Sequence, residues 1–407
     1  MKTLTAITLV LILAQQAFAE TWPQWRGPTR DGLFAGSEPW PEKLDGALKL
    51  KWESDLDDGY SGPIVSDHHV FTAETKDRQY EVVRAFSREN GKQIWEFQWE
   101  GKMSVPFFAR SNGSWIRSTP AYDGKHLYVA GMRDVLVCID AKTGKEVWRV
   151  DFKERYKTPL PAFGFVCSPL VTDDDLYVQA GASVVKLNKR SGEEIWRTMK
   201  DAGGMWGSVF SSPSLYEVNG TPQLLVQSRT TLAGINPESG KVEWEQEVKA
   251  FRGMNILTPM LHDGGILTSP YGGKTQMFTI AEDNTVSKKW SNKLQGYMSS
   301  PVILDGHAYL HLRNQRLVCV DLSDGAIKWT SPKAFGKYMS LIGNGDKLLA
   351  LDEKGQLFLF KASPEAFEKV DEYVVADQQA WAHLAIADNE IFVRHQKGIK
   401  VFSWKQE

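Results

Sequence analysis

Aromatic side chains and an arginine recur at one position of this sequence, shortly before a repeated Ser or Thr that is usually followed by Pro. Aligning the chain on that step gives eight equivalent residues: Tyr60, Arg117, Val166, Phe210, Ile256, Met298, Tyr338 and Trp381. Four of them are aromatic and one is a cation. Such a set suits a planar anionic ligand, an aromatic quinone or a peptide segment, because aromatic faces and cations attract these groups. The alternative is that the side chains pack against one another and plug a pore.

We select six of these positions as candidate ligand-binding residues: Tyr60, Arg117, Phe210, Met298, Tyr338 and Trp381. Nearby loops contribute further candidates: Arg110, Trp115, Phe163, Phe165, Trp206 and Arg252. The histidines show no metal-ligand spacing, since His68 and His69 are adjacent in one loop. We therefore expect no metal site and assign no catalytic residue.

The elements that must position these candidates are the strands of an internal repeat. Residues 135–148 indicate a buried strand, a tight turn at Thr143-Gly144-Lys145 and a second strand that ends at Trp148. The same sequence pattern recurs at intervals of roughly forty to fifty residues, a period typical of a β-propeller blade.

The number of blades follows from counting the copies of this repeat. Six clear copies end in Trp, a seventh has Val370 where Trp is expected, and an eighth, from Trp381 to Phe402, has only three strands. A strand at Leu48–Trp52 precedes the first copy and supplies the missing fourth strand. We predict an all-β, eight-bladed β-propeller of four-stranded antiparallel blades, the last blade closed by the N-terminal strand. A seven-bladed ring would require discarding one of the weaker copies.

The repeated residues have structural roles. Gly144 supplies the positive φ of a short hairpin turn, and Asp140 can accept hydrogen bonds from the amides of that turn. The indole N–H of Trp148 can reach a carbonyl of the neighbouring blade. These positions build the scaffold, so we expect binding to depend on the unrepeated residues at the other end of each blade.

Composition and the N-terminus indicate an exported protein. The 407 residues carry a formal net charge of −2, and without a basic excess we expect no nucleic-acid partner. Residues 1–19 combine Lys2, an apolar stretch and Ala17-Phe18-Ala19, which predicts a signal peptide cleaved after Ala19 and a periplasmic or extracellular protein. An uncleaved anchor is the alternative. No later stretch is long and apolar enough to cross a membrane.

The mature chain divides into an arm and one domain. Residues 20–47 are rich in Pro and Gly and predict an extended arm packed on the body, or one whose Trp22, Trp25 and Arg26 cover a pocket. Residues 48–407 form the single propeller domain. The three cysteines are expected to be buried and unpaired, because two of them fall in opposite blades, beyond disulfide reach: Cys138, Cys167 and Cys319.

The repeat resembles that of a known family. The motifs that carry the resemblance are Asp140-x-x-Thr143-Gly144-Lys145-x-x-Trp148 and the preceding Asp123-Gly124-x-x-Leu127-Tyr128-Val129. They are similar to the PQQ-like (pyrroloquinoline-quinone-like) β-propeller repeat of the quinoprotein alcohol dehydrogenases and the BamB-like proteins of outer-membrane assembly. The likeness covers residues 48–404. The start of the arm, residues 22–27, is similar to a group of exported bacterial proteins that carry this repeat.

The resemblance implies a fold and leaves two classes of function. In the dehydrogenases it implies a quinone under two adjacent half-cystines, a calcium ion with carboxylate and amide ligands, and an Asp general base. This sequence has no Cys-Cys pair and no Glu, Asn and Asp set that aligns with those ligands. We therefore expect no cofactor, with pyrroloquinoline quinone and calcium as the alternative.

The favoured function is that of a monomeric, exported binding or scaffold protein, without catalysis, that acts through its channel-mouth face. Its partner would be a protein segment or a small ligand, or it would dock as a subunit on an outer-membrane or cell-surface machine. The alternative is a quinone-dependent dehydrogenase. The long loops at 101–115 and 157–161 should lie on the mouth face, where we expect a partner to bind.

Overall fold

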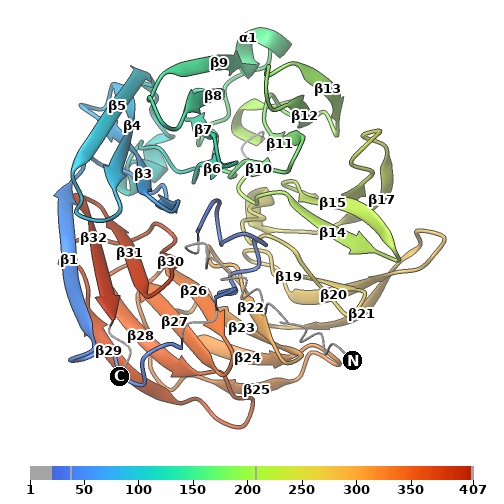
Figure 1. Ribbon diagram of the computed structural model, residues 1–407. Coiled ribbons are helices and arrows are strands. Elements are labelled where there is room, and N and C mark those ends of the chain that lie inside the picture. The colour runs from blue at the N-terminus through green and yellow to red at the C-terminus, as the bar shows by residue number, and fades with distance from the viewer. Residues whose placement is uncertain (1–20, 37–38, 207–208, 405–407) are drawn as a thin grey trace, which may run out of the picture.

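The computed structural model describes residues 21–36, 39–206 and 209–404, and their strands form a closed ring of eight sheets (Figure 1). Each sheet has four antiparallel strands, which confirms the predicted eight-bladed all-β propeller. The predicted signal peptide, residues 1–19, lies outside the described residues. No helix among the described residues is long and apolar enough to cross a membrane.

The blades are numbered in chain order, and their strands are given from the innermost to the outermost. The first four blades are I, β2 (Ile64–Val65), β3 (His69–Lys76), β4 (Tyr80–Ser87) and β5 (Gln93–Glu100); II, β6 (Ala121–Tyr122), β7 (His126–Gly131), β8 (Val135–Asp140) and β9 (Glu146–Asp151); III, β10 (Leu170–Val171), β11 (Asp175–Gln179), β12 (Val184–Asn188) and β13 (Glu194–Thr198); and IV, β14 (Ser214–Val218), β15 (Thr221–Gln227), β16 (Thr231–Ile235) and β17 (Val242–Glu247).

The last four blades are V, β18 (Met260–His262), β19 (Gly265–Thr268), β20 (Thr275–Ile280) and β21 (Val286–Asn292); VI, β22 (Val302–Leu304), β23 (His307–His311), β24 (Leu317–Asp321) and β25 (Ile327–Thr330); VII, β26 (Met339–Asn344), β27 (Lys347–Asp352), β28 (Gln356–Lys361) and β29 (Lys369–Val374); and VIII, β30 (Ala385–Ala387), β31 (Glu390–His395), β32 (Gly398–Trp404) and β1 (Leu48–Asp55). Short helices occupy four loops: η1 (Phe107–Asn112), α1 (Phe152–Tyr156), η2 (Gly204–Trp206) and η3 (Phe251–Gly253).

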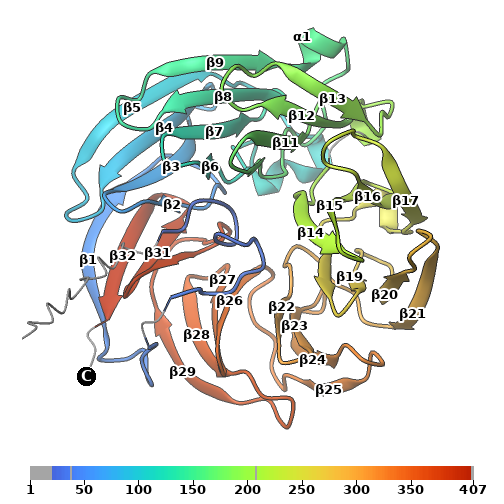
Figure 2. The same cartoon turned by 45° about the vertical axis from the view of Figure 1, so that its right-hand side comes forward.

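The N-terminal strand closes the ring as predicted. Strand β1 pairs antiparallel with β32, with Trp52 opposite Val401, and Figure 2 shows the two strands side by side. Arg88 of blade I adds an ion pair to Glu390 of blade VIII at 2.7 Å. Because the last blade combines strands from both ends of the chain, the ring has no open seam at this junction.

Outer-strand tryptophans join neighbouring blades, which confirms the predicted role of the indole N–H. In six cases the indole nitrogen donates to a backbone carbonyl of the next blade, over 2.8 to 3.1 Å: Trp52 to Arg88, Trp95 to Ala141, Trp148 to Lys189, Trp196 to Pro237, Trp290 to Leu322 and Trp329 to Ser363. Trp244 instead donates to Gln223 of its own blade. The turn of blade V on which Trp244 would dock, at residues 282–284, lacks the glycine of the repeated turn motif.

The turn glycines lie directly under these indoles. Gly144 has a φ of 71°, and a Cβ built on it would lie 2.6 Å from the Trp95 ring. Four further pairs share this arrangement: Gly91 with Trp52, Gly192 with Trp148, Gly240 with Trp196 and Gly325 with Trp290. The glycine therefore serves two needs, a left-handed turn and room for the indole of the preceding blade.

Blade VII replaces the tryptophan in a different way. The register of β28 with β29 places Asp371, rather than Val370, opposite Leu359, at the position that tryptophans occupy in other blades. The Asp371 carboxylate accepts hydrogen bonds from the amides of Leu44 and Asp45, at 2.7 and 3.0 Å. This outer strand thus fixes the segment that leads into β1 instead of docking on a neighbouring turn.

For five pairs of neighbouring blades, a Ser or Thr at the start of an inner strand links consecutive blades around the channel. Its hydroxyl oxygen accepts a hydrogen bond from a backbone amide of the preceding blade, over 2.9 to 3.2 Å: Thr119 from Gly62, Ser168 from Thr119, Ser212 from Ser168, Thr258 from Ser212 and Ser300 from Thr258. These bonds fix the strand starts next to one another. The residues just before them are consequently held at one end of the channel.

The cysteines behave as the sequence predicts. Cys138, Cys167 and Cys319 are all buried and free. Burial raises the pKa of each thiol to about 12, so at neutral pH they pack as small apolar side chains.

Candidate binding cavity

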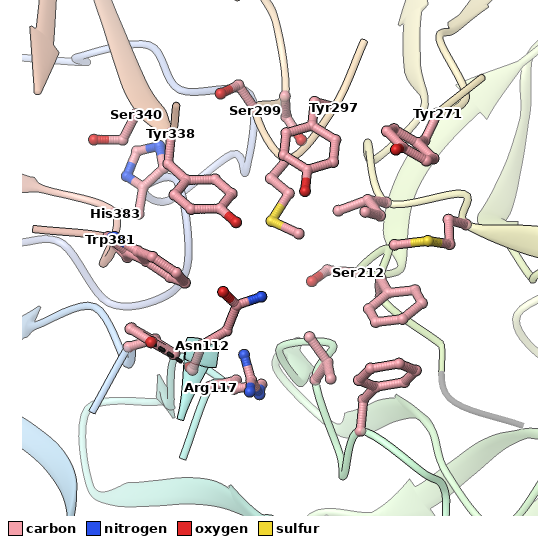
Figure 3. Close-up of a pocket in the computed structure, with 18 of the residues that line it drawn as sticks. Asn112, Arg117, Ser212, Tyr271, Tyr297, Ser299, Tyr338, Ser340, Trp381 and His383 are labelled. Carbon is pink, nitrogen blue, oxygen red and sulfur yellow. Dashed lines mark hydrogen bonds between the residues drawn. The ribbon is translucent and has the colours of Figure 1, made fainter. Parts of the chain in front are cut away.

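A cavity of about 680 Å³ lies at the end of the channel where the innermost strands begin (Figure 3). Its wall is largely aromatic, and ten aromatic residues line it: Trp25, Tyr60, Phe108, Phe163, Phe210, Phe251, Tyr271, Tyr297, Tyr338 and Trp381. A cavity of this size and character can hold a drug-sized molecule or a few residues of a peptide.

The structure brings the candidate residues together. All six selected residues line the cavity, as do the other two aligned positions: Tyr60, Arg117, Phe210, Met298, Tyr338 and Trp381, with Val166 and Ile256. Whether they bind a ligand stays a prediction. In each blade, the residue that the sequence alignment selected before the repeated Ser or Thr lines this one cavity.

The loop candidates divide into two groups. Phe163 and Arg252 line the cavity. Trp115 lies behind the wall, with its ring 5.3 Å from that of Tyr60, and Arg110 is exposed on η1. Phe165 does not face the cavity as expected, because its side chain is buried in the core between blades II and III, where its apolar ring packs among other apolar side chains. The side chain of Trp206 lies outside the described part of the structure.

One side of the wall is an arc of aromatic residues with polar atoms. Trp381 stacks on Tyr60, with ring centroids 4.5 Å apart and planes at 10°, and contacts Tyr338 at 4.1 Å. The arc continues from Tyr338 to Tyr297 at 5.7 Å and from Tyr297 to Tyr271 at 5.1 Å. The rings contact one another along the wall and leave the cavity open between them (Figure 3). Tyr271 and Tyr297 were not among the sequence candidates.

The other side of the wall is made of phenylalanines on the loops. Phe163 contacts Phe108 at 6.2 Å and Phe210 at 5.6 Å between ring centroids. Two guanidinium groups lie over phenylalanine rings: Arg229 over Phe210 at 5.5 Å and Arg252 over Phe251 at 5.1 Å. This side is therefore apolar with cations at its margin.

The charged residues of the lining are all cations. Arg117, Arg229 and Arg252 line the cavity, and none of the described residues that line it is Asp or Glu. Burial lowers the pKa of Arg117, while Tyr60 and Tyr338 raise it, and the guanidinium stays a cation at neutral pH. The cavity therefore favours negatively charged groups.

Three further ionisable residues of the lining have pKa values shifted away from neutral pH. Burial, together with the charge of Arg26, lowers the pKa of His383 to about 3, so this imidazole is neutral. Burial raises the pKa of Tyr60 and of Tyr338 well above 10. General acid–base catalysis needs a group with a pKa near the working pH, and these residues do not provide one.

The N-terminal arm closes the inner end of the cavity. The backbone of Trp22 pairs with Val65 of blade I, at 2.8 and 3.0 Å, and the carbonyl of Pro23 accepts from the amide of Tyr122 in blade II at 2.7 Å. Further on, the arm pairs with Gly343 of blade VII. The arm thus crosses the channel, as Figure 1 shows at the centre of the ring.

Two buried arginines fasten the arm to the inner strands. Arg30 donates to the carbonyls of Pro169 and Ser168, at 2.7 and 3.1 Å, and Arg26 donates to the carbonyl of Pro301 and to that of Asp31 in the arm. Burial lowers their pKa values to about 9 for Arg30 and about 10 for Arg26. The guanidinium forks satisfy carbonyls that the short inner strands leave unpaired, which is a structural reason for arginine at these positions.

The arm lies deeper than the mouth residues and forms a floor. The arm pairs with residues that come after the mouth residue on the same inner strand. Examples are Val65, which follows Tyr60, and Gly343, which follows Tyr338. Trp25 lines the cavity, with the guanidinium carbons of Arg26 and Arg30 at 5.6 and 5.7 Å from its ring. The cavity is therefore open at the mouth and closed at its inner end. This geometry agrees with the alternative in which arm residues cover a pocket.

Exposed apolar side chains gather at the mouth. Phe107 is 79% exposed, Phe108 52% and Phe251 51%, and Met205 and Met298 are also exposed. The loops that carry them include residues 101–115, 199–206, 249–256 and 293–301, and each connects the outer strand of one blade to the inner strand of the next. A cluster of exposed apolar residues next to a cavity is typical of a binding surface.

Comparisons with known proteins agree with the fold. A family model described as outer membrane protein assembly factor BamB matches residues 79–331, more than half of the chain. The outer membrane protein assembly factor BamB of Yersinia pestis is 22% identical over 309 residues, which are 68% of this chain and 76% of that protein.

Two solved structures share the architecture. BamB from Moraxella catarrhalis superposes with a TM-score of 0.66 at 13% identity, over 89% of this chain and 99% of that one. A quinohemoprotein alcohol dehydrogenase from Comamonas testosteroni superposes with a TM-score of 0.67 at 14% identity, over 95% of this chain and 81% of that one. At such identities the superpositions show the fold alone, because one propeller fold hosts different functions.

Proposed function

Because the chain belongs to the family described as outer membrane protein assembly factor BamB, we propose that it is an exported, non-catalytic binding protein of outer-membrane protein assembly. In this proposal the mouth cavity receives a segment of a partner protein, and the exposed apolar residues around it extend the contact. The observation that carries the proposal is a large aromatic cavity, closed at its inner end and bordered by Phe107, Phe108 and Phe251.

The distribution of exposed apolar residues supports this face over the others. Apart from the mouth cluster and Leu215 on the inner strand β14, the exposed large apolar side chains of the described residues lie on outer strands, for example Ile94, Val147 and Ile195, each next to a docking tryptophan. Single exposed apolar residues are ordinary on a protein surface. A partner that buries the mouth cluster would remove the main contiguous apolar surface from water.

Photo-crosslinking tests the proposed function. With p-benzoylphenylalanine in place of Phe108 or Phe210, we expect covalent adducts with one protein in cells that produce this chain. The crosslinked peptide should map to a single segment of that partner, and a synthetic copy of the segment should compete. Trp381→Ala should lower the adduct yield at least fivefold, because Trp381 forms part of the wall.

The control probe replaces Val147, which is 47% exposed on the outer strand β9, away from the cavity. The proposal predicts no specific adduct there. Equal adducts at Val147 and Phe108, or adducts only at Val147, would contradict binding through the mouth.

The alternative function is that of a quinone-dependent dehydrogenase, which the shared fold and the aromatic stack of Trp381 on Tyr60 make worth testing. The residues present do not fit its metal: calcium takes oxygen ligands, mainly carboxylates, and no described residue of the lining is Asp or Glu. No group of three or more His, Cys, Asp or Glu among the described residues could hold a metal ion. This chemistry is therefore less well supported than binding.

A reconstitution experiment distinguishes the two functions. When purified protein is mixed with pyrroloquinoline quinone and calcium chloride, we expect no quinone absorbance to remain after gel filtration and no dye-linked oxidation of ethanol. Quinone that is retained by the natural protein but lost in Trp381→Ala, together with oxidation of the alcohol, would overturn the non-catalytic proposal.

A further inference from the structure

The charges in the cavity restrict the chemistry of the segment that it receives. The chain as a whole has a formal net charge of −2, yet the cavity is lined by Arg117, Arg229 and Arg252 without a described carboxylate. Arg26 and Arg30 add two buried cations beneath the Trp25 floor. The lining therefore carries positive charge without a carboxylate among its described residues, although the chain as a whole is slightly negative, and a binding site of one sign attracts groups of the opposite sign.

Arg117 is placed to pair with an anion. One terminal nitrogen donates to the carbonyl of Gly113 at 2.7 Å, and the guanidinium carbon lies 5.2 Å from the Tyr60 ring. The Nε atom is buried and has no hydrogen-bond partner in the protein. A guanidinium group usually satisfies its donors when buried, and a carboxylate can accept two of them at once. Figure 3 shows this side chain pointing into the cavity beside Asn112.

Trp381 lies next to Arg117, because both side chains contact the ring of Tyr60. The indole N–H of Trp381 is buried without a hydrogen-bond partner, while its ring is held by stacking on Tyr60. Buried donors of this kind cost free energy unless a ligand or water accepts from them. Because the Trp381 indole nitrogen is buried, an occupant meets the ring of Trp381, and the guanidinium group of Arg117 is the donor that favours an acceptor-rich occupant.

The apolar part of the lining determines which side chains of the bound segment lie next to its anionic group. The phenylalanine side of the cavity, with Phe163 and Phe210 in contact, offers apolar contacts and no hydrogen-bonding atoms. The floor formed by the arm prevents a chain from passing through the channel. An occupant must therefore enter from the mouth, as a chain end or as the tip of a loop.

From these observations we infer that the partner segment carries a carboxylate next to aromatic or other large apolar side chains, with the carboxylate at Arg117 and the apolar groups against the phenylalanines. The inference rests on the proposed function, since it specifies the segment that the cavity receives. The carboxylate can come from a C-terminus or from an Asp or Glu side chain, and both present the same two oxygens to a guanidinium group.

Two hexapeptide libraries test the inference and separate the sources. One library has amidated C-termini and the other has free C-terminal carboxylates, and every position, including the C-terminal residue, is randomised. Peptides that co-elute with the full mature protein are identified by mass spectrometry. Enrichment of Asp or Glu beside aromatic residues in the amidated library would indicate a side-chain carboxylate. Aromatic C-terminal residues enriched only in the free-acid library would indicate a chain end.

Matched peptides and variants then measure the contribution of the arginines. For an enriched peptide, replacing the acid by its amide should weaken binding about tenfold or more, because a charge-assisted bond to a guanidinium is lost. In Arg117→Gln, or Arg117→Gln with Arg252→Gln, the acid and amide peptides should bind within threefold of each other. The control Arg110→Gln, at an exposed arginine that does not line the cavity, should keep the full difference. Circular dichroism and melting checks that each variant is folded.

The failure of this inference can be distinguished from the failure of the proposed function. Peptides that bind without a preference for carboxylates, or that prefer Lys and Arg, would overturn the inference while peptide binding in the cavity stands. A carboxylate preference that persists in the Arg117 and Arg252 variants would overturn the assignment to these residues. If no peptide binds and no crosslink forms at Phe108 or Phe210, the proposed function fails and the inference fails with it.

Discussion

Arg30→Ala is expected to lower the free energy of unfolding by about 3 kcal/mol and to release the arm from the channel. The Arg30 side chain is 2% exposed and donates to the carbonyls of Pro169 and Ser168 and to the side-chain oxygen of Gln24 at 3.2 Å. Alanine would leave these buried acceptors unpaired, at a cost of about 1–3 kcal/mol each. It would also remove the cation next to the ring of Trp25.

Urea unfolding and trypsin cleavage check this prediction together. Arg26 remains a trypsin site in Arg30→Ala, and its bond is protected in the natural protein because Arg26 is 1% exposed. We expect the urea midpoint to fall and cleavage after Arg26 to accelerate in native buffer. The control Arg110→Ala, at an exposed arginine of η1, should change the stability by less than about 0.5 kcal/mol. An Arg30→Ala protein with unchanged stability and a protected arm would show that the arginine does not anchor the arm.

The position of the arm illustrates what the sequence could not predict. The blades follow from a repeat, in which each copy confirms the others, so even blade VII without its tryptophan could be assigned. The arm occurs once, and nothing in residues 22–30 indicates that its arginines reach carbonyls of blades III and VI. Such contacts join residues more than a hundred positions apart and depend on the finished ring.

The lining residues that belong to the repeat could be predicted from the sequence, whereas most of those on the loops could not. In five blades the Ser or Thr at the start of the inner strand accepts a hydrogen bond from the preceding blade, and the residues before this position face one space. Tyr271 and Phe251 lie outside that register, on connections of irregular length. Phe165 lies only one residue before Val166, yet it points into the core, because successive residues of an extended chain alternate in direction.

The second large effect on stability is expected from replacing a turn glycine on which a tryptophan indole packs. Gly144→Ala is expected to lower the free energy of unfolding by about 3 kcal/mol. Alanine at a φ of 71° costs about 1–2 kcal/mol, and its Cβ would lie 2.6 Å from the Trp95 ring, which must then move off the turn of blade II. The displaced indole would also lose its 2.9 Å hydrogen bond to the Ala141 carbonyl.

Gly220 provides a matched control, because it has a φ of 73° and nothing within 4 Å of a built Cβ. Gly220→Ala should therefore show the conformational cost alone, about 1 kcal/mol. In a Trp95→Ala background, Gly144→Ala should cost no more than Gly220→Ala does in the natural protein, which gives a coupling of about 2 kcal/mol between positions 95 and 144. Equal costs for Gly144→Ala with and without the indole would mean that the repeat glycine is needed only for its turn. The predicted coupling would instead show that the glycine is also required for one blade to dock on the next, and hence for the closed ring that holds the mouth residues together.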